Sequence, residues 1–297
     1  MRRKWYGRDT GLAVRMFIVM FLLAAVYLFF LTAMWAAGLD FFAIGVIAAI
    51  LLGAQYFLSD KLVLWSMGAH VVDSTQAPHL HAMVERLAAM ADLPKPKIAM
   101  VDTDIPNAFA TGRSPKHAVI AVTTGLLDRL DQPEVEAVLA HELTHVRNRD
   151  VAVITIASFF ATVAQFILRF SMFGSFRGRR GRDGQSVVVV YLVSLLVWIV
   201  SFFLIRALSR YREYAADRGS AIITGAPAHL EAALVKISGT MQRIPQQDLR
   251  KVDGMNAFFI VPALKGSSFM ELFSTHPSME KRLARLKRMQ QEMETGI

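Results

Sequence analysis

Four long runs without any charged side chain dominate the pattern of apolar and polar positions along the chain. Each run has roughly the 17–25 residues that a helix needs to cross the hydrocarbon core of a membrane. The composition agrees, because 54% of the residues are hydrophobic, which is high for a soluble chain. We therefore expect a mostly α-helical membrane protein with four hydrophobic helices, at residues 16–37, 41–58, 151–168 and 187–205.

Between the second and third runs the pattern changes to shorter segments. Apolar positions recur at helical spacing from Pro78 onward, and two β-rich runs at 98–101 and 118–123 predict strands on either side of a turn-rich segment. These elements predict a cytoplasmic α+β domain with a small β-sheet. The expected organisation is a hydrophobic hairpin at 1–60, a first part of this domain at 61–150, a second hydrophobic hairpin at 151–208 and a second part of the domain at 209–297.

The N-terminal hairpin carries a signal for its orientation. A basic cluster that includes Arg2, Arg3 and Lys4 precedes the first run, and such clusters stay on the cytoplasmic side. The first run is too long for the core of a signal peptide, so we expect the hairpin to be retained and the chain to return to the cytoplasm near Ser59.

The second hairpin leaves two alternatives open. Its link, at 176–184, contains four arginines. If both flanking runs span the membrane, this link lies outside, against the positive-inside tendency; a hairpin that does not fully cross would keep it cytoplasmic. Either way, the chain is back on the starting side by Ser209.

The charge and the lack of cysteine exclude other classes of site. The formal net charge is +9, but the basic residues lie beside the apolar runs and along the last predicted helix, where they ring an apolar face formed by Leu283, Leu286 and Met289. This placement favours anionic lipid over nucleic acid as the partner. Without cysteine there is no disulfide framework and no thiolate ligand or nucleophile.

The stretch His141-Glu142-Leu143-Thr144-His145 indicates metal chemistry. Two histidines four positions apart project from one face of a helix and can bind one Zn²⁺ ion. Glu142 follows the first histidine and stands beside the metal, which is the place for a general base.

The surrounding sequence supports a helix at this motif. Asp131, Pro133 and Glu134 form a helix-start signature well before it. Neither proline nor glycine separates the motif from the third apolar run, so we expect its helix to continue into that run.

A third protein ligand is needed, because a catalytic zinc site holds three ligands and keeps a fourth position open. Glu213 and Asp217 come directly after the fourth run, four positions apart on a predicted helix. Glu213 can ligate the ion, while Asp217 can accept the free ring N–H of a ligand histidine.

Taken together, these motifs resemble the HtpX family of bacterial membrane zinc metallopeptidases, which shares its peptidase domain with the eukaryotic prenyl-protein-processing protease. The resemblance covers nearly the whole chain. It rests on the N-terminal hairpin, Pro106-Asn107-Ala108-Phe109-Ala110-Thr111-Gly112, the stretch from His141 to His145, Arg212-Glu213-Tyr214-Ala215-Ala216-Asp217, Asn256-Ala257-Phe258-Phe259-Ile260 and Ser274-Thr275-His276-Pro277-Ser278.

The resemblance implies a zincin-like endopeptidase with one Zn²⁺ per chain and Glu213 as its third protein ligand. It implies a multi-pass protein of the bacterial inner membrane whose site faces the cytoplasm and which cuts misfolded membrane proteins. In related metallopeptidases a histidine placed like His276 hydrogen-bonds the oxyanion that forms from the scissile carbonyl, so His276 is a candidate catalytic residue.

The strands before the metal motif suggest where a polypeptide substrate binds. An exposed strand edge holds an extended peptide by main-chain hydrogen bonds, and we expect this contact at Asn107, Ala108, Phe109, Ala110 and Thr111. The alternative is that the strands only complete the core of the domain.

Three other functions are alternatives for this sequence. The first is a processing protease with one defined substrate. The second is a zinc-binding scaffold or chaperone that does not cleave, against which the intact Glu142 argues. The third is a channel or transporter, which is poorly supported because the runs hold almost no ionisable residues.

Overall fold

The computed structural model describes residues 9–36, 41–174, 183–244, 259–261 and 274–295. The chain divides into two units, described here one at a time: Thr10–Phe57 with Val153–Leu208, and Met1–Asp9 with Leu58–Ala152 and Ser209–Ile297. The arginines of the 176–184 link and Asn256, Ala257 and Phe258 of the quoted motifs lie outside the described residues.

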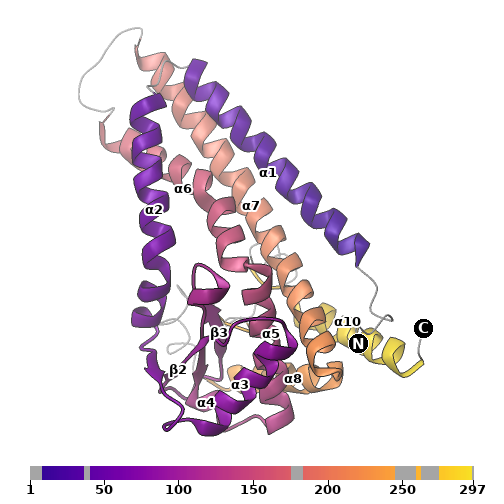
Figure 1. The fold of residues 1–297 in the computed structure, drawn as a ribbon. Helices are drawn as coiled ribbons and strands as arrows, with labels where there is room; N and C mark the ends of the chain where they lie inside the picture. Colours follow the sequence, from indigo (N-terminus) through magenta and orange to yellow (C-terminus); the bar gives the residue numbers. More distant parts are fainter. Residues whose placement is uncertain (1–8, 37–40, 175–182, 245–258, 262–273, 296–297) are drawn as a thin grey trace. The chain divides into compact units, whose positions relative to one another are not determined.

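The first unit is built from long apolar helices (Figure 1): α1 (Thr10–Ala36), the greater part of α2 (Phe41–Ser66), most of α6 (Asp150–Gly174) and the first part of α7 (Asp183–Thr224). Three helical stretches are long and apolar enough to cross a membrane: Thr10–Ala36, Asp150–Arg169 and Val188–Thr224. The second apolar run of the sequence lies in α2, which is helical but is not among these three stretches. The fourth membrane-crossing helix therefore stays a prediction.

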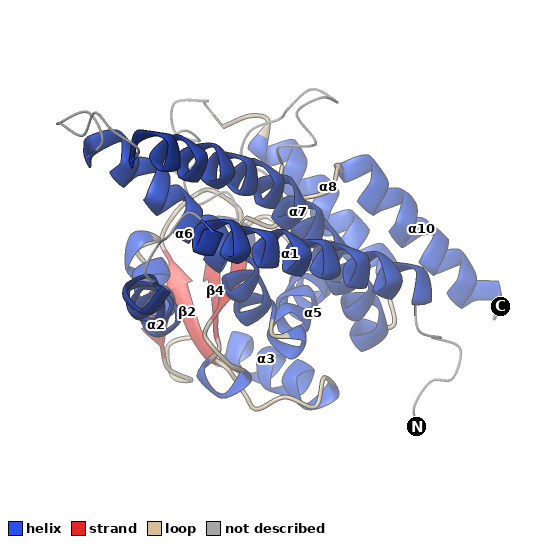
Figure 2. Ribbon diagram, turned by 90° about the horizontal axis from the view of Figure 1, so that it is seen from above, coloured by secondary structure: helices blue, strands red, loops and turns tan. Residues whose placement is uncertain are grey.

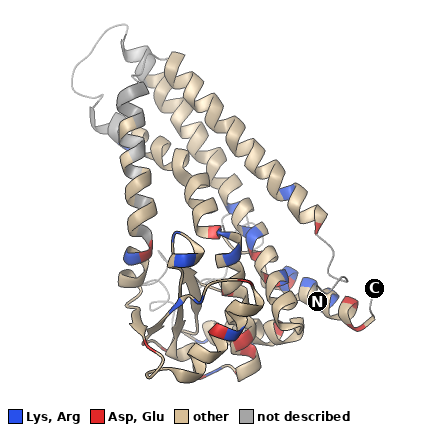
Figure 3. Ribbon diagram, in the orientation of Figure 1, with Lys and Arg blue, Asp and Glu red and all other residues tan. Residues whose placement is uncertain are grey.

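The apolar helices have one face for each other and one for lipid. In α1, Leu23, Phe30 and Met34 are buried, whereas Phe17 and Leu28 are exposed. Charged residues lie near helix ends, as Figure 3 shows for the start of α1 and for the second half of α2. A broad exposed apolar surface of this kind suits contact with lipid rather than with water.

The second unit contains a four-stranded mixed sheet in the order β1-β2-β4-β3. The strands are β1 (His70–Val72), β2 (Lys97–Val101), β3 (Ala108–Thr111) and β4 (Val119–Thr123). β2 and β4 are parallel, while β1 and β3 pair antiparallel with β2 and β4. The strands expected at 98–101 and 118–123 are confirmed. β3 lies in the segment between them that we described as turn-rich, and β1 had no counterpart in the prediction.

Both faces of this sheet are covered. Ile98, Ile120 and Val122 point into the main core, which they share with α3 (Pro78–Met90) and α5 (Gln132–Asn148) (Figure 2). On the opposite face, a smaller cluster contains Ala99 and Phe109 and packs against the last part of α2. The helices α8 (Pro227–Met241) and α10 (Met279–Thr295) complete the main core; the short elements are α4 (Thr124–Leu127) and the 3-10 helix Pro115–His117.

The helix of the metal motif ends earlier than the sequence predicts. α5 stops at Asn148, and Arg149 adopts a left-handed backbone conformation (φ 56°, ψ 42°) before α6 begins at Asp150. The prediction of one continuous helix was therefore wrong. The break turns Asp150 back toward α5, where it contacts His145 and Arg212, and these contacts compensate for a conformation that is costly in a residue other than glycine.

Candidate active site

The two histidines of the motif lie on α5, and the start of this helix is fixed as the sequence predicts. Asp131 is the N-cap and forms a capping box with Glu134, whose carboxylate accepts a hydrogen bond from the Asp131 N–H at 2.9 Å. His141 is buried and His145 is half-buried, and their Nε2 atoms lie 3.2 Å apart. The spacing of four residues on the helix therefore brings the Nε2 atoms of both histidines close together.

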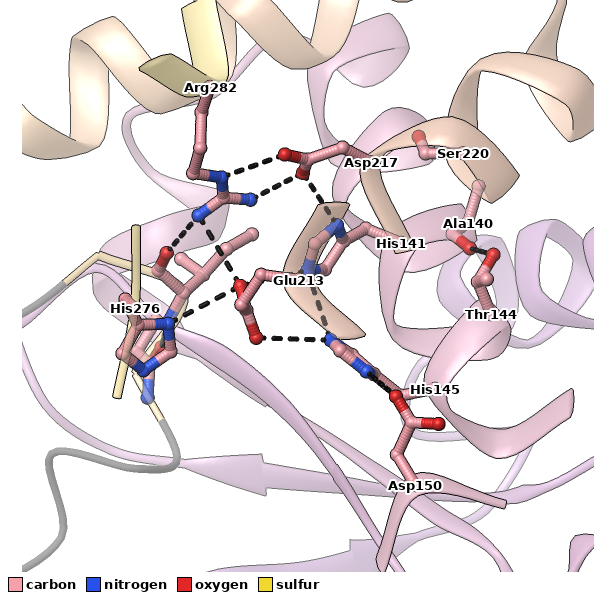
Figure 4. Close-up of polar contacts among 12 residues, drawn as sticks. Ala140, His141, Thr144, His145, Asp150, Glu213, Asp217, Ser220, His276 and Arg282 are labelled. Carbon is pink, nitrogen blue, oxygen red and sulfur yellow. Dashed lines mark hydrogen bonds and ion pairs between the residues drawn. The ribbon is translucent and has the colours of Figure 1, made fainter. Parts of the chain in front are cut away.

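Glu213 brings a carboxylate to this point from α7. Its Oε1 lies 3.5 Å from His145 Nε2 and its Oε2 lies 3.7 Å from His141 Nε2 (Figure 4). One ligand atom from each of the three residues falls within 4.8 Å of the other two, and this is the only such group found among the described residues. Two imidazoles and one carboxylate suit a divalent metal ion, and zinc in particular.

Close packing holds α7 against α5. Gly219 faces Thr144 so closely that a Cβ atom added at Gly219 would lie 2.2 Å from the Thr144 Cγ2. One residue further on, the Ser220 hydroxyl donates a hydrogen bond to the Ala137 carbonyl at 2.7 Å. These contacts fix the distance between the helix that carries Glu213 and the helix that carries the histidines.

Each histidine also contacts a carboxylate through its other ring nitrogen. His141 Nδ1 lies 3.1 Å from Asp217 Oδ1, and His145 Nδ1 lies 2.6 Å from Asp150 Oδ2. The sequence analysis expected Asp217 to accept the free ring N–H of a ligand histidine, and this role stays a prediction. Sequence reasoning missed Asp150, although a carboxylate shortly after the motif was a usable signal, because it assumed an unbroken helix there.

Burial and charge set the ionisation of the carboxyl groups. Burial raises the pKa of Glu142, which suits a group that must take up a proton. Burial alone would also raise the pKa of Asp217, but the Arg282 guanidinium and His141 hold it below its usual range. The pKa of Glu213 is likewise held well below its usual range, by His276 and His141.

Glu142 lies beside the edge strand of the sheet, and a hydrogen bond from the Ala110 backbone acts on its carboxyl group. Among the strands that the structure describes, β3 pairs only with β4, and Thr123 donates its N–H to the Asn107 carbonyl at 3.0 Å. Because bonded and non-bonded residues alternate in an antiparallel pair, the main-chain groups of Ala108 and Ala110 point away from β4. Asn107 belongs to the segment expected to bind substrate, but its side chain contacts the protein itself: its Oδ1 accepts a hydrogen bond from the Ile260 N–H at 3.1 Å.

His276 is brought into the same cluster from the segment before α10. It is buried, and its Nδ1 lies 3.3 Å from Glu213 Oε2. The segment is held by Arg210, which donates a hydrogen bond to the Ser274 carbonyl at 3.0 Å.

Arg282 was missed by the sequence reasoning, which counted it in the solvated basic ring of the last helix. It is only 1% exposed and binds Asp217. The available signal was its spacing: Arg282 stands four and seven positions before Leu286 and Met289 and so lies on the buried face.

Comparison with known proteins agrees with this geometry. Residues 74–290 match the model of peptidase family M48. The chain is 63% identical to a protease HtpX homologue of Moorella thermoacetica over 98% of this chain and 99% of that protein. It is 62% identical to protease HtpX homologue 2 of Methanosarcina acetivorans, over 99% of this chain and all of that protein.

A solved structure shares the fold. The crystal structure of S. mikatae Ste24p is similar with a TM-score of 0.55 at 19% identity, over 93% of this chain and 66% of that one. Fold, cluster and relatives together define a membrane metalloprotease with several membrane helices. More narrowly, the chain belongs to peptidase family M48, and the resemblance to HtpX proteins is confirmed.

Proposed function

We propose that this metalloprotease is a zinc endopeptidase of the bacterial inner membrane that hydrolyses peptide bonds in misfolded or damaged membrane proteins. The observation that carries the proposal is the convergence of His141, His145 and Glu213 next to Glu142 and the edge strand β3. The basic cluster before α1 supports a cytoplasmic N-terminus.

Each residue of the cluster has its own role in the proposed reaction. When bound by His141, His145 and Glu213, Zn²⁺ would supply the Lewis acidity that activates water and polarises the scissile carbonyl. Glu142 takes the proton of the attacking water and delivers it to the leaving amine. No side chain forms a covalent bond to the substrate.

The substrate is held in an extended form along β3. The outward-facing carbonyls of Ala108 and Ala110 accept hydrogen bonds from the peptide N–H groups, which places its scissile bond beside Glu142. His276 donates a hydrogen bond to the oxyanion that develops on the scissile carbonyl.

The decisive experiment compares the wild-type protein with Glu142→Gln after purification in detergent. We expect self-cleavage and casein degradation to be lost in the variant while its zinc content stays at one ion per chain. Glu136→Gln is the matched control, because Glu136 lies on the same helix but pairs with Arg86 instead. Retained cleavage in Glu142→Gln would show that Glu142 is not the general base. Zinc-loaded wild-type protein that cleaves nothing would support a non-cleaving scaffold.

A second experiment tests binding along β3 without changing the protein. Replacing one substrate amide near the scissile bond by an ester removes a single N–H donor, so KM should rise while kcat changes little. The same ester placed outside the paired segment is the control. Equal KM values for both substrates would refute strand pairing.

The breadth of the substrate range separates quality control from dedicated processing. Under the proposal, membranes incubated with the wild-type protein, but not with Glu142→Gln, should yield fragments from many damaged membrane proteins. Cleavage of one protein at one position would instead establish a processing protease.

A further inference from the structure

Each of the two histidines in the cluster is the first member of the same series of contacts: histidine, aspartate, arginine and main-chain carbonyl. In the first series, Arg282 donates from Nε to Asp217 Oδ2 at 3.0 Å and from Nη2 to Asp217 Oδ1 at 2.6 Å (Figure 4). Asp217 Oδ1 lies against His141 Nδ1. Arg282 Nη1 is itself fixed by the Ile260 carbonyl, at 2.7 Å.

The second series repeats this order on the other side of the cluster. Asp150 contacts His145 Nδ1 through Oδ2 and the Arg212 guanidinium through Oδ1. Arg212 also donates from Nη2 to the Asn148 carbonyl at 2.8 Å. The two series share no residue, and their arginines come from different helices, α10 and α7.

Both arginines are buried at a considerable cost. Arg282 is 1% exposed and Arg212 is 6% exposed. A buried ion pair is often no more stabilising than apolar side chains of the same volume, so its contribution to stability does not by itself account for two such pairs. What the two pairs have in common is that each ends on Nδ1 of a histidine.

We propose that Arg282 and Arg212 are positioning residues that act on the metal site through Asp217 and Asp150. A carboxylate that accepts the Nδ1–H leaves the lone pair of the ring on Nε2, facing the cluster. A carboxylate held only by the histidine can rotate about its side-chain bonds. The Arg282 guanidinium, anchored on a main-chain carbonyl, binds both oxygens of Asp217 and so fixes the plane of that carboxylate and hence the direction of the imidazole. Arg212 holds Asp150 through one oxygen.

Arg282 has a further contact that Arg212 lacks. Its Nη1 lies 3.5 Å from Glu213 Oε2, so it adjoins the third residue of the cluster as well as the aspartate behind the first. The direction of His141 and the charge beside Glu213 both depend on one side chain of α10. This role rests on the proposed metal-binding function.

The test uses the full-length protein in detergent and measures metal binding apart from proteolysis. Dissociation constants for Zn²⁺ come from competition with a chelator, and the visible spectrum of bound Co²⁺ reports the ligand geometry. Arg282→Met should weaken Zn²⁺ binding by about 10- to 100-fold and change the Co²⁺ spectrum. Arg282→Lys keeps the charge without the planar fork and should recover only part of the affinity.

The control is Arg288→Met, an exposed position on the same helix, which should bind Zn²⁺ like the wild type. Arg212→Met tests the second series and should also weaken binding. Wild-type affinity and an unchanged Co²⁺ spectrum in Arg282→Met would overturn the proposal. A wild-type protein that binds no metal would instead overturn the proposed function together with this inference.

Arg282→Met leaves Asp217 buried without its partner, which can prevent folding. The double variant Asp217→Leu with Arg282→Met removes both charges and should fold. If this folded variant binds Zn²⁺ more weakly than the wild type, by the factor given above, it supports the positioning role. If it binds Zn²⁺ as tightly as the wild type, the role is refuted.

Discussion

Replacing Gly219 by alanine should separate the two helices of the site. A Cβ atom there would lie 2.2 Å from Cγ2, 2.3 Å from Oγ1 and 2.8 Å from Cβ of Thr144. Carbon atoms in contact normally stay about 3.5–4.0 Å apart. Because Thr144 lies between the two histidines on α5 and Gly219 follows Glu213 on α7, relief of the clash requires these helices to move apart by about 1 Å.

A displacement of that size disrupts metal–ligand distances but is tolerated by the packing of the fold. Metal–ligand distances are defined to within about 0.2 Å, whereas overpacking in a core typically costs about 1–3 kcal/mol. Gly219→Ala should therefore remain folded, with a modestly lower Tm, and should lose zinc affinity by more than tenfold. The assays are thermal unfolding and chelator competition on the same preparation.

Two further variants separate helix displacement from other effects of alanine. Gly239→Ala is the control, since no described atom outside its own helical turn lies within 4 Å of a Cβ at Gly239 on α8, and it should leave zinc binding unchanged. Adding Thr144→Ala to Gly219→Ala removes the two closest atoms but leaves the Cβ, so it should restore part of the affinity. Wild-type zinc affinity in Gly219→Ala would refute the reasoning.

Three other predictions concern stability. Asn107→Ala should cost about 1–3 kcal/mol, because it removes the buried acceptor of the Ile260 N–H; a change below about 0.5 kcal/mol in urea unfolding would contradict this. The Thr75 hydroxyl and the N–H groups of Gln76 and Thr75 lower the pKa of Asp73, so the stability it contributes is present at neutral pH and is lost as the pH falls through that lowered pKa. Asp73→Ala should accordingly lower Tm at pH 7 by more than it does near pH 3, and an equal loss at both pH values would contradict the assignment. Chelation of zinc should lower Tm, by an amount equivalent to about 2.7 kcal/mol if the free ion stood at 100 times its Kd; a Tm independent of zinc concentration would count against the metal cluster.

Local signals in the sequence were sufficient for part of the fold. The start of α5 followed from Asp131, Pro133 and Glu134, which act within one turn of the chain. The strands at 98–101 and 118–123 followed from runs of β-branched and apolar residues. Local signals could not find β3, because only Phe109 and Thr111 of its four residues favour strands, and the segment becomes a strand by pairing with β4.

The site was predictable where it depends on spacing along one helix, and not where it depends on contacts between distant segments. His141 and His145 meet because they are four positions apart, and Glu213 and Asp217 share a helix face for the same reason. Asp150 reaches His145 only because Arg149 breaks the helix. From the sequence alone, Arg282 is expected at the surface of a basic helix. Only the folded structure shows that it binds Asp217, which lies far away in the sequence.

The residues of the site lie far apart along the chain, so they are synthesised at different times. His145 is followed by the whole second hydrophobic hairpin before Glu213 appears, and Arg282 comes later still. At about 5–20 residues per second, roughly 7–27 s pass between the synthesis of His145 and that of Arg282. For about the first half of that interval the growing polypeptide carries the histidine motif without the Glu213 carboxylate, and for all of it without the Arg282 guanidinium. Under the proposed function, hydrolysis can begin only after the second hairpin has been synthesised, because Glu213 follows it in the sequence.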